Sequence, residues 1–476
     1  MVWDLTSYLL IALYIFTIGS TILMMLMENR SPYKSIAWIV VLLIFPILGL
    51  GFYILVGRNF RKKFVVSHRS LKTEKGRPEE TENLGPQLRS LPASTQGLAN
   101  MVGNSCGANL YDNNQITLYD NGTSLFKDVF AEMEKAKVYL HVEYYVFNSD
   151  EVGNQFMDIL KRKSLEGVKV RLIVDDVGSW KLKKSSVKQL RDAGVEVFCF
   201  MRVALPFLSS RVNYRNHRKI IIIDGKVGFT GGMNVADRYV KGTKWGCWRD
   251  THLRVEGCGV YGLQKVFIMD WFFVSRTYLD DDNSFFPKLE SNNGEALMQI
   301  VHSGPDTLWE SIMQMFFSMI AQARSSVLIQ TPYFLPNTQI VEALQTAALS
   351  GVDVRIILPR KSDAGFALKA SCSYIDDMLK AGIKVYFYEP GFLHSKTIVV
   401  DGFVSTIGTA NMDFRSFDQN FEVNTIIYDS AVASKLQQRF MDDLKNSTQI
   451  QLPEWNERPK MKKLGESWAR LFSPLM

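Results

Sequence analysis

His217-Arg-Lys219-Ile-Ile-Ile-Ile-Asp224 is the stretch that decides the fold, and it has a second copy at His394-Ser-Lys396-Thr-Ile-Val-Val-Asp401. Both copies have the form H-x-K-x4-D. Each runs on into Gly-x-x-Asn at the same offset, ending at Asn234 and Asn411. Two copies with matched tails indicate an internal duplication.

The run after each lysine is apolar and rich in β-branched residues, which predicts a buried strand. Residues two apart on a strand point to the same face, so the histidine and lysine of each copy project together. Asp-Gly then joins this run to a second β-rich segment, which predicts a hairpin turn at Asp224 and Asp401. The two aspartates are either turn-formers or catalytic groups, and both interpretations stay open.

Two histidines and two lysines suit phosphodiester chemistry. One neutral imidazole attacks phosphorus, while the other, protonated, gives its proton to the leaving oxygen. The ammonium groups of Lys219 and Lys396 and the amides of Asn234 and Asn411 suit the oxygens of a phosphate. This hypothesis predicts a phosphohistidine intermediate and requires no metal and no cofactor.

The N-terminal region contains two uncharged stretches, at residues 5–27 and 35–57. Each exceeds the roughly 20 residues that a membrane-spanning helix needs. They predict a two-helix transmembrane hairpin within residues 1–60, and buried soluble helices are the alternative. Basic residues from Arg58 to Lys63 follow the second stretch, which predicts a cytoplasmic catalytic region by the positive-inside rule.

Residues 61–104 are rich in Ser, Glu, Lys, Pro and Gly, which predicts a basic and polar linker. From residue 105 onward, apolar strands alternate with amphipathic helices, and the repeat extends beyond the motifs. Glu166-Gly-Val-Lys-Val-Arg-Leu-Ile-Val resembles Ser350-Gly-Val-Asp-Val-Arg-Ile-Ile-Leu. The pattern predicts an α/β domain made twice, at 105–290 with His217 and at 291–476 with His394.

The net charge of the chain and its C-terminal segment indicate which partners the protein could bind. The formal net charge of +7 suits an anionic membrane surface or nucleic acid. Residues 460–472 are basic and carry Trp468, Leu471 and Phe472. This segment either lies on an anionic membrane or docks on the catalytic core.

The paired motifs resemble those of the phospholipase D superfamily. The resemblance implies two α/β/α sandwich domains related by a pseudo-two-fold, with the active site between them. It also implies an acidic residue downstream of each motif that orients a histidine. Glu422 fits that position in the second half and Asp250 in the first, where extra residues precede it.

The N-terminal hairpin, the linker and the two-motif region together resemble the bacterial cardiolipin synthases. The implied reaction moves a phosphatidyl group from one phosphatidylglycerol to another and releases glycerol. In the implied roles His217 attacks phosphorus and His394 is the acid and base, while both lysines and both asparagines hold phosphate oxygens. The implied place is the bacterial cell membrane as a multi-pass protein, with phosphatidylglycerol and other anionic lipids as partners.

Three other functions stay open. A hydrolytic phospholipase D or a phosphatidylserine synthase of the same superfamily would share the motifs. A phosphodiesterase acting on nucleic acid would show salt-sensitive DNA binding, but a membrane hairpin disfavours it, so we expect no nucleic-acid partner. A non-catalytic membrane scaffold has no chemical need for the histidines, lysines and asparagines.

Overall fold

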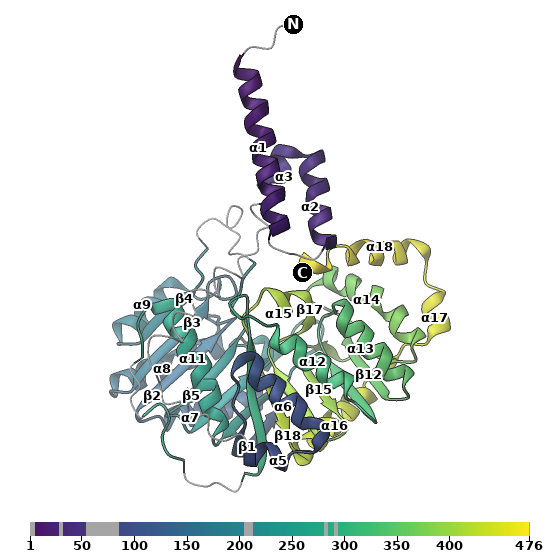
Figure 1. Cartoon of the computed structure of the whole chain (residues 1–476). Coiled ribbons are helices and arrows are strands. Elements are labelled where there is room, and N and C mark those ends of the chain that lie inside the picture. Colours follow the sequence, from purple (N-terminus) through teal and green to yellow (C-terminus); the bar gives the residue numbers. More distant parts are fainter. Residues whose placement is uncertain are drawn as a thin grey trace. The chain divides into compact units, whose positions relative to one another are not determined.

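A computed structural model of the chain describes residues 5–27, 32–53, 85–203, 213–279, 284–289 and 294–475 (Figure 1). The described residues fall into two compact units. The N-terminal unit contains α1 (Leu5–Met27), α2 (Pro32–Ile44) and α3 (Pro46–Phe52). The main body contains the described residues from 85 onward, apart from Val203.

In the N-terminal unit, the second apolar stretch is divided rather than forming one helix. Proline lacks the N–H of a helix interior and its ring crowds the preceding turn, so α2 ends at Ile44 and α3 begins at Pro46. In the ranges that the structure describes, no helix combines the length and the apolarity needed to cross a membrane. The predicted transmembrane hairpin is therefore not supported. Arg58 to Lys63, on which its orientation depended, lie outside the described residues.

One mixed sheet of 15 strands runs through the main body. Its order is β19-β13-β12-β10-β15-β16-β18-β9-β1-β8-β6-β5-β2-β3-β4. The first half of the body is built from β1 (Tyr111–Tyr119), α7 (Gly122–Glu134), β2 (Tyr139–Tyr144), α8 (Glu151–Leu165), β3 (Lys169–Asp175), α9 (Lys184–Asp192), β4 (Glu196–Phe200), β5 (Lys219–Ile223), β6 (Val227–Gly231), α10 (Arg238–Lys241), β7 (Cys247–Arg249), β8 (His252–Glu256) and α11 (Gly259–Ser275).

The second half repeats this series and adds a C-terminal extension. It is built from β9 (Ala296–Ser303), α12 (Ser311–Ala321), β10 (Ser326–Gln330), β11 (Phe334–Leu335), α13 (Thr338–Leu349), β12 (Asp353–Pro359), α14 (Gly365–Lys380), β13 (Lys384–Tyr388), β14 (Gly391–Leu393), β15 (Thr397–Val400), β16 (Val404–Gly408), β17 (Met412–Asp413), α15 (Phe414–Asp418), β18 (Glu422–Tyr428) and α16 (Ser430–Lys445). The extension consists of β19 (Ser447–Gln449), α17 (Leu452–Asn456), α18 (Lys460–Arg470) and the 3-10 helix η3 (Ser473–Leu475).

The order of the sheet makes the duplication visible. Outward from its centre, the first half runs β1-β8-β6-β5-β2-β3-β4 and the second runs β9-β18-β16-β15-β10-β12-β13. Each position in one series has the same place in chain order as its counterpart in the other. The two series meet where β1 pairs with β9 in antiparallel fashion, as a two-fold between them requires. The predicted duplicated α/β fold is confirmed.

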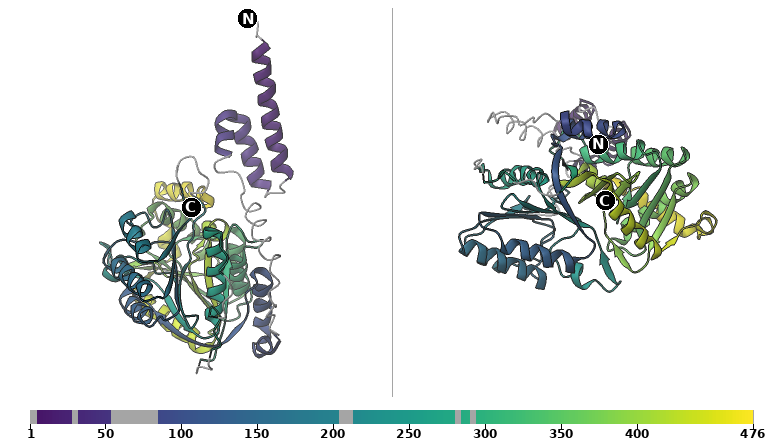
Figure 2. Two further views of the ribbon diagram at one scale, coloured as in Figure 1. Left: turned by 90° about the vertical axis from the view of Figure 1, so that its left-hand side faces the viewer. Right: turned by 90° about the horizontal axis from the view of Figure 1, so that it is seen from below.

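Helices cover both faces of the sheet (Figure 2). In the first half, α7 and α8 bury Leu125, Val129 and Phe156 against one face. In the second half, α12, α13 and α14 form the corresponding core, together with α6 (Ala93–Cys106). A third core, containing α11 and α16, receives residues from both halves. The body is thus layered as helix, sheet and helix in each half.

The predicted linker is shorter than the composition indicated. Residues 54–84 lie outside the described part, but residues 85–90 form α5 (Gly85–Ser90) and residues 93–106 form α6. Leu98, Ala99 and Val102 of α6 are buried in the core of the second half. These apolar residues at helical spacing outweigh the Ser, Gly and Asn around them, because their burial removes apolar surface from water.

Strand register places the two motifs at equivalent edges. Strands β2, β3 and β4 are parallel, and β5 runs antiparallel to β2 with Lys219 opposite Tyr144. Lys219 therefore lies at the carboxyl end of β2. In the second half Thr397, which follows Lys396, is opposite Gln330 at the carboxyl end of β10. Sheets with parallel strands commonly bind ligands at that edge.

Candidate active site

The two motifs form the predicted hairpins. Strand β5 is buried along its whole length and pairs with β6, and β15 pairs with β16 in the same way. Asp224 and Asp401 stand at the turns with φ angles of 50° and 52°. Aspartate tolerates this left-handed conformation better than most residues, which explains its place before glycine.

Asp224 and Asp401 do not reach the other motif residues. The Asp224 carboxylate accepts the backbone N–H groups of residues 137–139 at 2.8, 2.9 and 2.8 Å. Asp401 accepts those of residues 324–326 at 2.9, 2.7 and 2.9 Å. Each aspartate thus ties its turn to the start of a neighbouring strand, roughly 16 Å along β5 or β15 from the lysine. These contacts support the turn-forming interpretation of both aspartates.

The segments that lead into the histidines cross between the halves. The His217 N–H donates to the Phe421 carbonyl at 2.9 Å, and the His394 N–H donates to the Arg249 carbonyl at 2.7 Å. Strand β14, which precedes His394, pairs in parallel with β7, which precedes Asp250. Each histidine is therefore placed directly beside the acidic residue of the opposite half.

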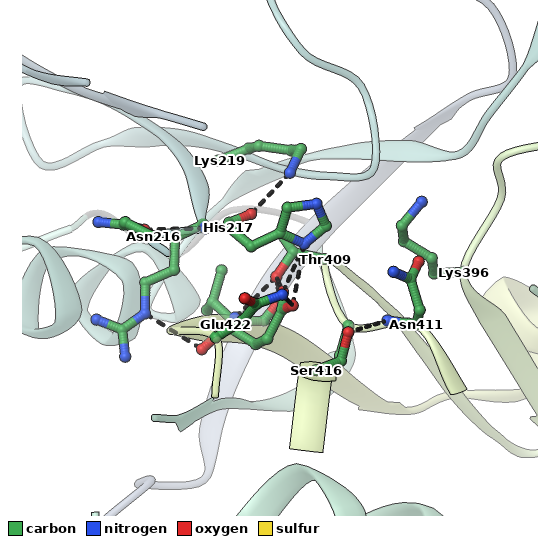
Figure 3. A network of polar contacts seen from close by, with 12 residues as sticks. Asn216, His217, Lys219, Lys396, Thr409, Asn411, Ser416 and Glu422 are labelled. Atoms are coloured by element: carbon green, nitrogen blue, oxygen red, sulfur yellow. Dashed lines mark hydrogen bonds and ion pairs between the residues drawn. The ribbon is translucent and has the colours of Figure 1, made fainter. Parts of the chain in front are cut away.

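Each imidazole is held by that acid. His217 Nδ1 lies 3.0 Å from both carboxylate oxygens of Glu422 (Figure 3). His394 Nδ1 lies 2.6 Å from Asp250 Oδ2. The two acids expected from the resemblance thus each contact a histidine, and the pairing is crosswise rather than within each half. Because Nδ1 is occupied in both rings, Nε2 is the nitrogen left for chemistry.

The two lysines converge on the same site. Lys219 Nζ donates to the His217 carbonyl at 2.7 Å, and Lys396 Nζ donates to the His394 carbonyl. Figure 3 shows the His217 ring between Lys219 and Lys396. Burial is the main reason that the pKa of each histidine is lowered, and the charges of both lysines lower each one further. The halves therefore form one site with two His-Lys pairs.

The two asparagines differ in their surroundings. Asn234 accepts the Val146 N–H at 3.0 Å and donates to the Tyr239 hydroxyl at 2.8 Å, so its amide holds the surrounding loop. Asn411 lies beside Lys396 in Figure 3. Its Oδ1 is buried without a hydrogen-bond partner among the described residues. The Asn411 side chain also hydrogen-bonds to the Asp413 carboxyl, so both amides already have partners.

The two acids that contact the histidines differ in the direction of their pKa shifts. Burial alone would raise the pKa of Glu422, but the His217 imidazole, Lys219 and the Thr409 hydroxyl lower it overall. Burial raises the pKa of Asp250, despite the charge of Lys396. Burial also lowers the pKa of Lys219 to about 7. Glu422 is therefore the more firmly ionised of the two acids.

Several residues that contact the site were not predicted from the sequence. Thr409 and Asn420 donate to Glu422, and the rings of Tyr145 and Trp248 lie 4.9 and 5.4 Å from those of His217 and His394. Thr409 lies within the Gly-x-x-Asn tail, and Asn420 lies two residues before Glu422. Their positions beside motif residues therefore made both of them predictable as neighbours of the site. Tyr145 and Trp248 are placed by strand ends and register, which spacing alone does not reveal. Among the described residues, no group of three or more His, Cys, Asp or Glu is arranged to hold a metal ion.

Known families and curated proteins match most of this chain. The family described as "Cardiolipin synthase, PLD-like domain" matches residues 129–244 and 316–444, once in each half, and a "Phospholipase_D-nuclease N-terminal" family matches residues 12–58. The cardiolipin synthase of Geobacillus kaustophilus is 42% identical over 460 residues, covering 94% of this chain and 90% of the relative. Cardiolipin synthase 2 of Bacillus anthracis is 42% identical over 469 residues, covering 97% and 90%.

A solved structure supports the fold alone. The phosphatidylserine synthase of Haemophilus influenzae matches with a TM-score of 0.61 and 14% identity, covering 80% of this chain and all of that chain. Fold and paired motifs therefore define a phospholipase D-like phosphodiester enzyme. At the level of sequence, the chain belongs to the cardiolipin synthase family. It is a phosphatidyltransferase that makes cardiolipin.

Proposed function

We propose that the enzyme joins two phosphatidylglycerol molecules into cardiolipin and glycerol by a double displacement at His217 and His394. The observation that carries this proposal is the crosswise pair of imidazole–carboxylate contacts, at 3.0 and 2.6 Å. These contacts leave two Nε2 atoms for one nucleophile and one proton carrier. Two buried lysines supply positive charge for the phosphate between them.

In the first step, His217 Nε2 attacks the phosphorus of one phosphatidylglycerol. The bond from phosphorus to the headgroup glycerol oxygen breaks, and His394 gives that oxygen its proton. In the second step, the terminal hydroxyl of another phosphatidylglycerol attacks phosphorus, the phosphorus–nitrogen bond breaks, and the hydroxyl proton passes to His394. No nucleotide is needed, because one phosphodiester replaces another.

The difference between the acids supports His217 as the nucleophile. The ring that bonds to phosphorus becomes positively charged, so an ionised carboxylate at its Nδ1 stabilises the intermediate. Glu422 has the lowered pKa and contacts His217 through both oxygens. Burial lowers the pKa of His394 strongly, so its neutral ring is suited to take the hydroxyl proton in the second step.

The phosphate oxygens are assigned to both lysines and to the asparagines. Lys219 and Lys396 are the principal groups, and the amide N–H groups of Asn234 and Asn411 are the further donors proposed. Phosphatidylglycerol and other anionic lipids would be the partners, and the enzyme would act in association with a membrane. Water is the competing acceptor, and its exclusion from the intermediate favours transfer.

Product analysis with pure phosphatidylglycerol tests the proposal. The wild-type enzyme should release glycerol and cardiolipin in equal amounts, without nucleotide. Phosphatidic acid as the main product would mean that water resolves the intermediate, and a hydrolase would replace the transferase proposed here. Addition of serine to the same assay identifies a phosphatidylserine synthase if phosphatidylserine appears.

A further inference from the structure

Helix α18 turns an apolar stripe toward solvent. Glu466 and Ala469 of this helix are 3% and 0% exposed, and Arg470 binds Asp377 of α14 at 3.2 Å. Met461, Leu464, Trp468 and Leu471 are instead 76%, 62%, 56% and 74% exposed. Their spacing of three and four residues places them along one side of the helix. An amphipathic helix normally buries such a stripe, so this one is unpartnered within the main body.

Aromatic rings extend the stripe onto α14. The rings of Trp468 and Phe472 lie 4.9 Å apart, and Phe366 of α14 lies 5.6 and 5.9 Å from them. We call the six exposed residues on these two helices the α18 patch: Phe366, Met461, Leu464, Trp468, Leu471 and Phe472. A continuous apolar surface of this kind marks an interaction site on most soluble proteins.

Lysine side chains flank the apolar stripe on α18. Lys460, Lys462 and Lys463 lie on the same helix, and Lys460 and Lys462 are exposed. The acidic residue of α18, Glu466, is buried and bound to Arg458 at 2.8 Å. An apolar stripe with aromatic residues and a lysine flank matches the surface of a bilayer containing anionic lipids.

The patch lies beside the His394 side of the active site. Asp363 lies in the loop after β12, three residues before Phe366 of α14. The Asp363 carboxylate accepts a hydrogen bond from the Tyr333 hydroxyl. The charge of Asp363 acts on His394 itself. The helix η3, directly after the patch, packs against α15, which follows Asn411. In Figure 1, α18 runs along α14 at the margin of the main body.

A matching exposed aromatic residue flanks the His217 side. Trp180, in the loop after β3, is 69% exposed and is followed by Lys181, Lys183 and Lys184. The neighbouring Ser179 hydroxyl donates to the Tyr145 carbonyl at 2.9 Å, and the Tyr145 ring packs on His217. The loop after β3 and the start of α14, which follows β12, therefore carry exposed aromatic groups on the two sides of the paired histidines.

We propose that the α18 patch, with Trp180 on the opposite side of the site, docks the main body onto an anionic lipid surface. Docking there holds the two histidines at the bilayer surface, so a phosphatidylglycerol headgroup reaches them while its acyl chains stay among lipids. The choice of lipid as the occupant rests in part on the proposed function, because both substrates are lipids.

Photo-crosslinking of the full chain tests the occupant without using activity. p-Benzoylphenylalanine is placed at Leu464 in one variant and at Leu349 in another, and each is irradiated on phosphatidylglycerol vesicles. Leu349 is the matched control, since it is 76% exposed but ends α13 at the amino end of β12. Lipid adducts at 464 and not at 349 are expected. Adducts of 464 to the N-terminal helices or to a second copy of the chain would overturn the proposal.

Kinetics on two forms of one substrate provide the second test. Leu464→Asp with Leu471→Asp should lower the rate on phosphatidylglycerol vesicles at least about tenfold, with little change on short-chain phosphatidylglycerol dispersed as monomers. The control, Leu165→Asp with Leu349→Asp, alters leucines that are 75% and 76% exposed at the amino edge and should leave both rates unchanged. Equal losses on both substrates, or none on either, would contradict docking. Absence of cardiolipin from wild type on both substrates would instead refute the proposed function, and the crosslinks alone would then decide the patch.

Discussion

The His217 and His394 sides of the active site share one topology, but the acids that contact the two histidines have pKa values shifted in opposite directions. Both histidines enter at the carboxyl edge of parallel strands, and both contact the acid of the opposite half. The pKa of Glu422 is lowered, whereas that of Asp250 is raised by burial. Duplication therefore gives both sides the same geometry, while the side chains around each imidazole shift the pKa of the two acids in opposite directions. If this difference separates the roles of the two histidines, variants of the two sides should fail in different ways.

Removal of each histidine should separate nucleophile from proton carrier. His217→Ala should lower cardiolipin formation to background, because no covalent path remains. His394→Ala should lower it by about 10²- to 10⁴-fold, the usual contribution of a general acid and base. A phosphatidyl ester of p-nitrophenol sharpens the comparison, since its leaving group needs no proton. Release of p-nitrophenol should survive in His394→Ala and vanish in His217→Ala, and the reverse pattern would exchange the two roles.

The acid variants should fail at different steps. Glu422→Gln should slow attack on the first phosphatidylglycerol, and Asp250→Asn should slow resolution of the intermediate. Each should cost about 10²- to 10⁴-fold, because an amide holds the imidazole in a different tautomer. Rapid-quench measurement of the covalent intermediate distinguishes them, with little in Glu422→Gln and an excess in Asp250→Asn. Equal amounts in both variants would remove the asymmetry between the halves.

Lys219 should make phosphate binding depend on pH near neutrality. Burial lowers its pKa to about 7, so the ammonium form is present below that pH and is lost as pH rises through it. We therefore expect kcat/KM of the wild type to fall above about pH 7. Lys219→Arg should be less active throughout but flat over the same range, because a guanidinium stays charged. An unchanged fall in Lys219→Arg would assign the titration to another group.

The turn aspartates should affect stability rather than chemistry. Asp224→Ala and Asp401→Ala each remove a carboxylate that accepts three backbone N–H groups, and should cost about 2–4 kcal/mol of folding free energy. Asp→Asn at the same positions is the matched control, since asparagine keeps an acceptor and tolerates the positive φ. Thermal unfolding should show the loss, while kcat of the folded fraction stays within about twofold. A large fall in kcat with an unchanged Tm would instead support a catalytic role for these aspartates.

The duplicated fold and the His-Lys pairs were predictable from the sequence because each motif is local. A β-branched run, an Asp-Gly turn and a fixed spacing lie within a few residues of one another. The crosswise pairing was not predictable, since it depends on β7 meeting β14 and on Asn216 meeting Phe421, contacts between distant segments. The role of Asp224 was ambiguous because a turn-former and a catalytic acid have the same sequence signature.

Two helical features near the N-terminal end were not predictable from composition. The uncharged stretch at 35–57 has the length of a membrane span, but Pro46 divides it into α2 and α3. The polar composition of residues 85–104 indicated a linker, yet α6 buries Leu98 and Val102 in the core. Averaged hydropathy does not register where a single proline or a helical stripe falls.

The position of the covalent intermediate tests the central claim most directly. The enzyme is mixed with phosphatidylglycerol labelled at phosphorus, quenched within a turnover under alkaline conditions that preserve phosphohistidine, and digested for peptide mapping. A phosphatidyl or phosphoryl label is expected on His217, absent from His217→Ala and increased in Asp250→Asn. A label on His394, or none on either histidine while cardiolipin still forms, would contradict His217 as the nucleophile.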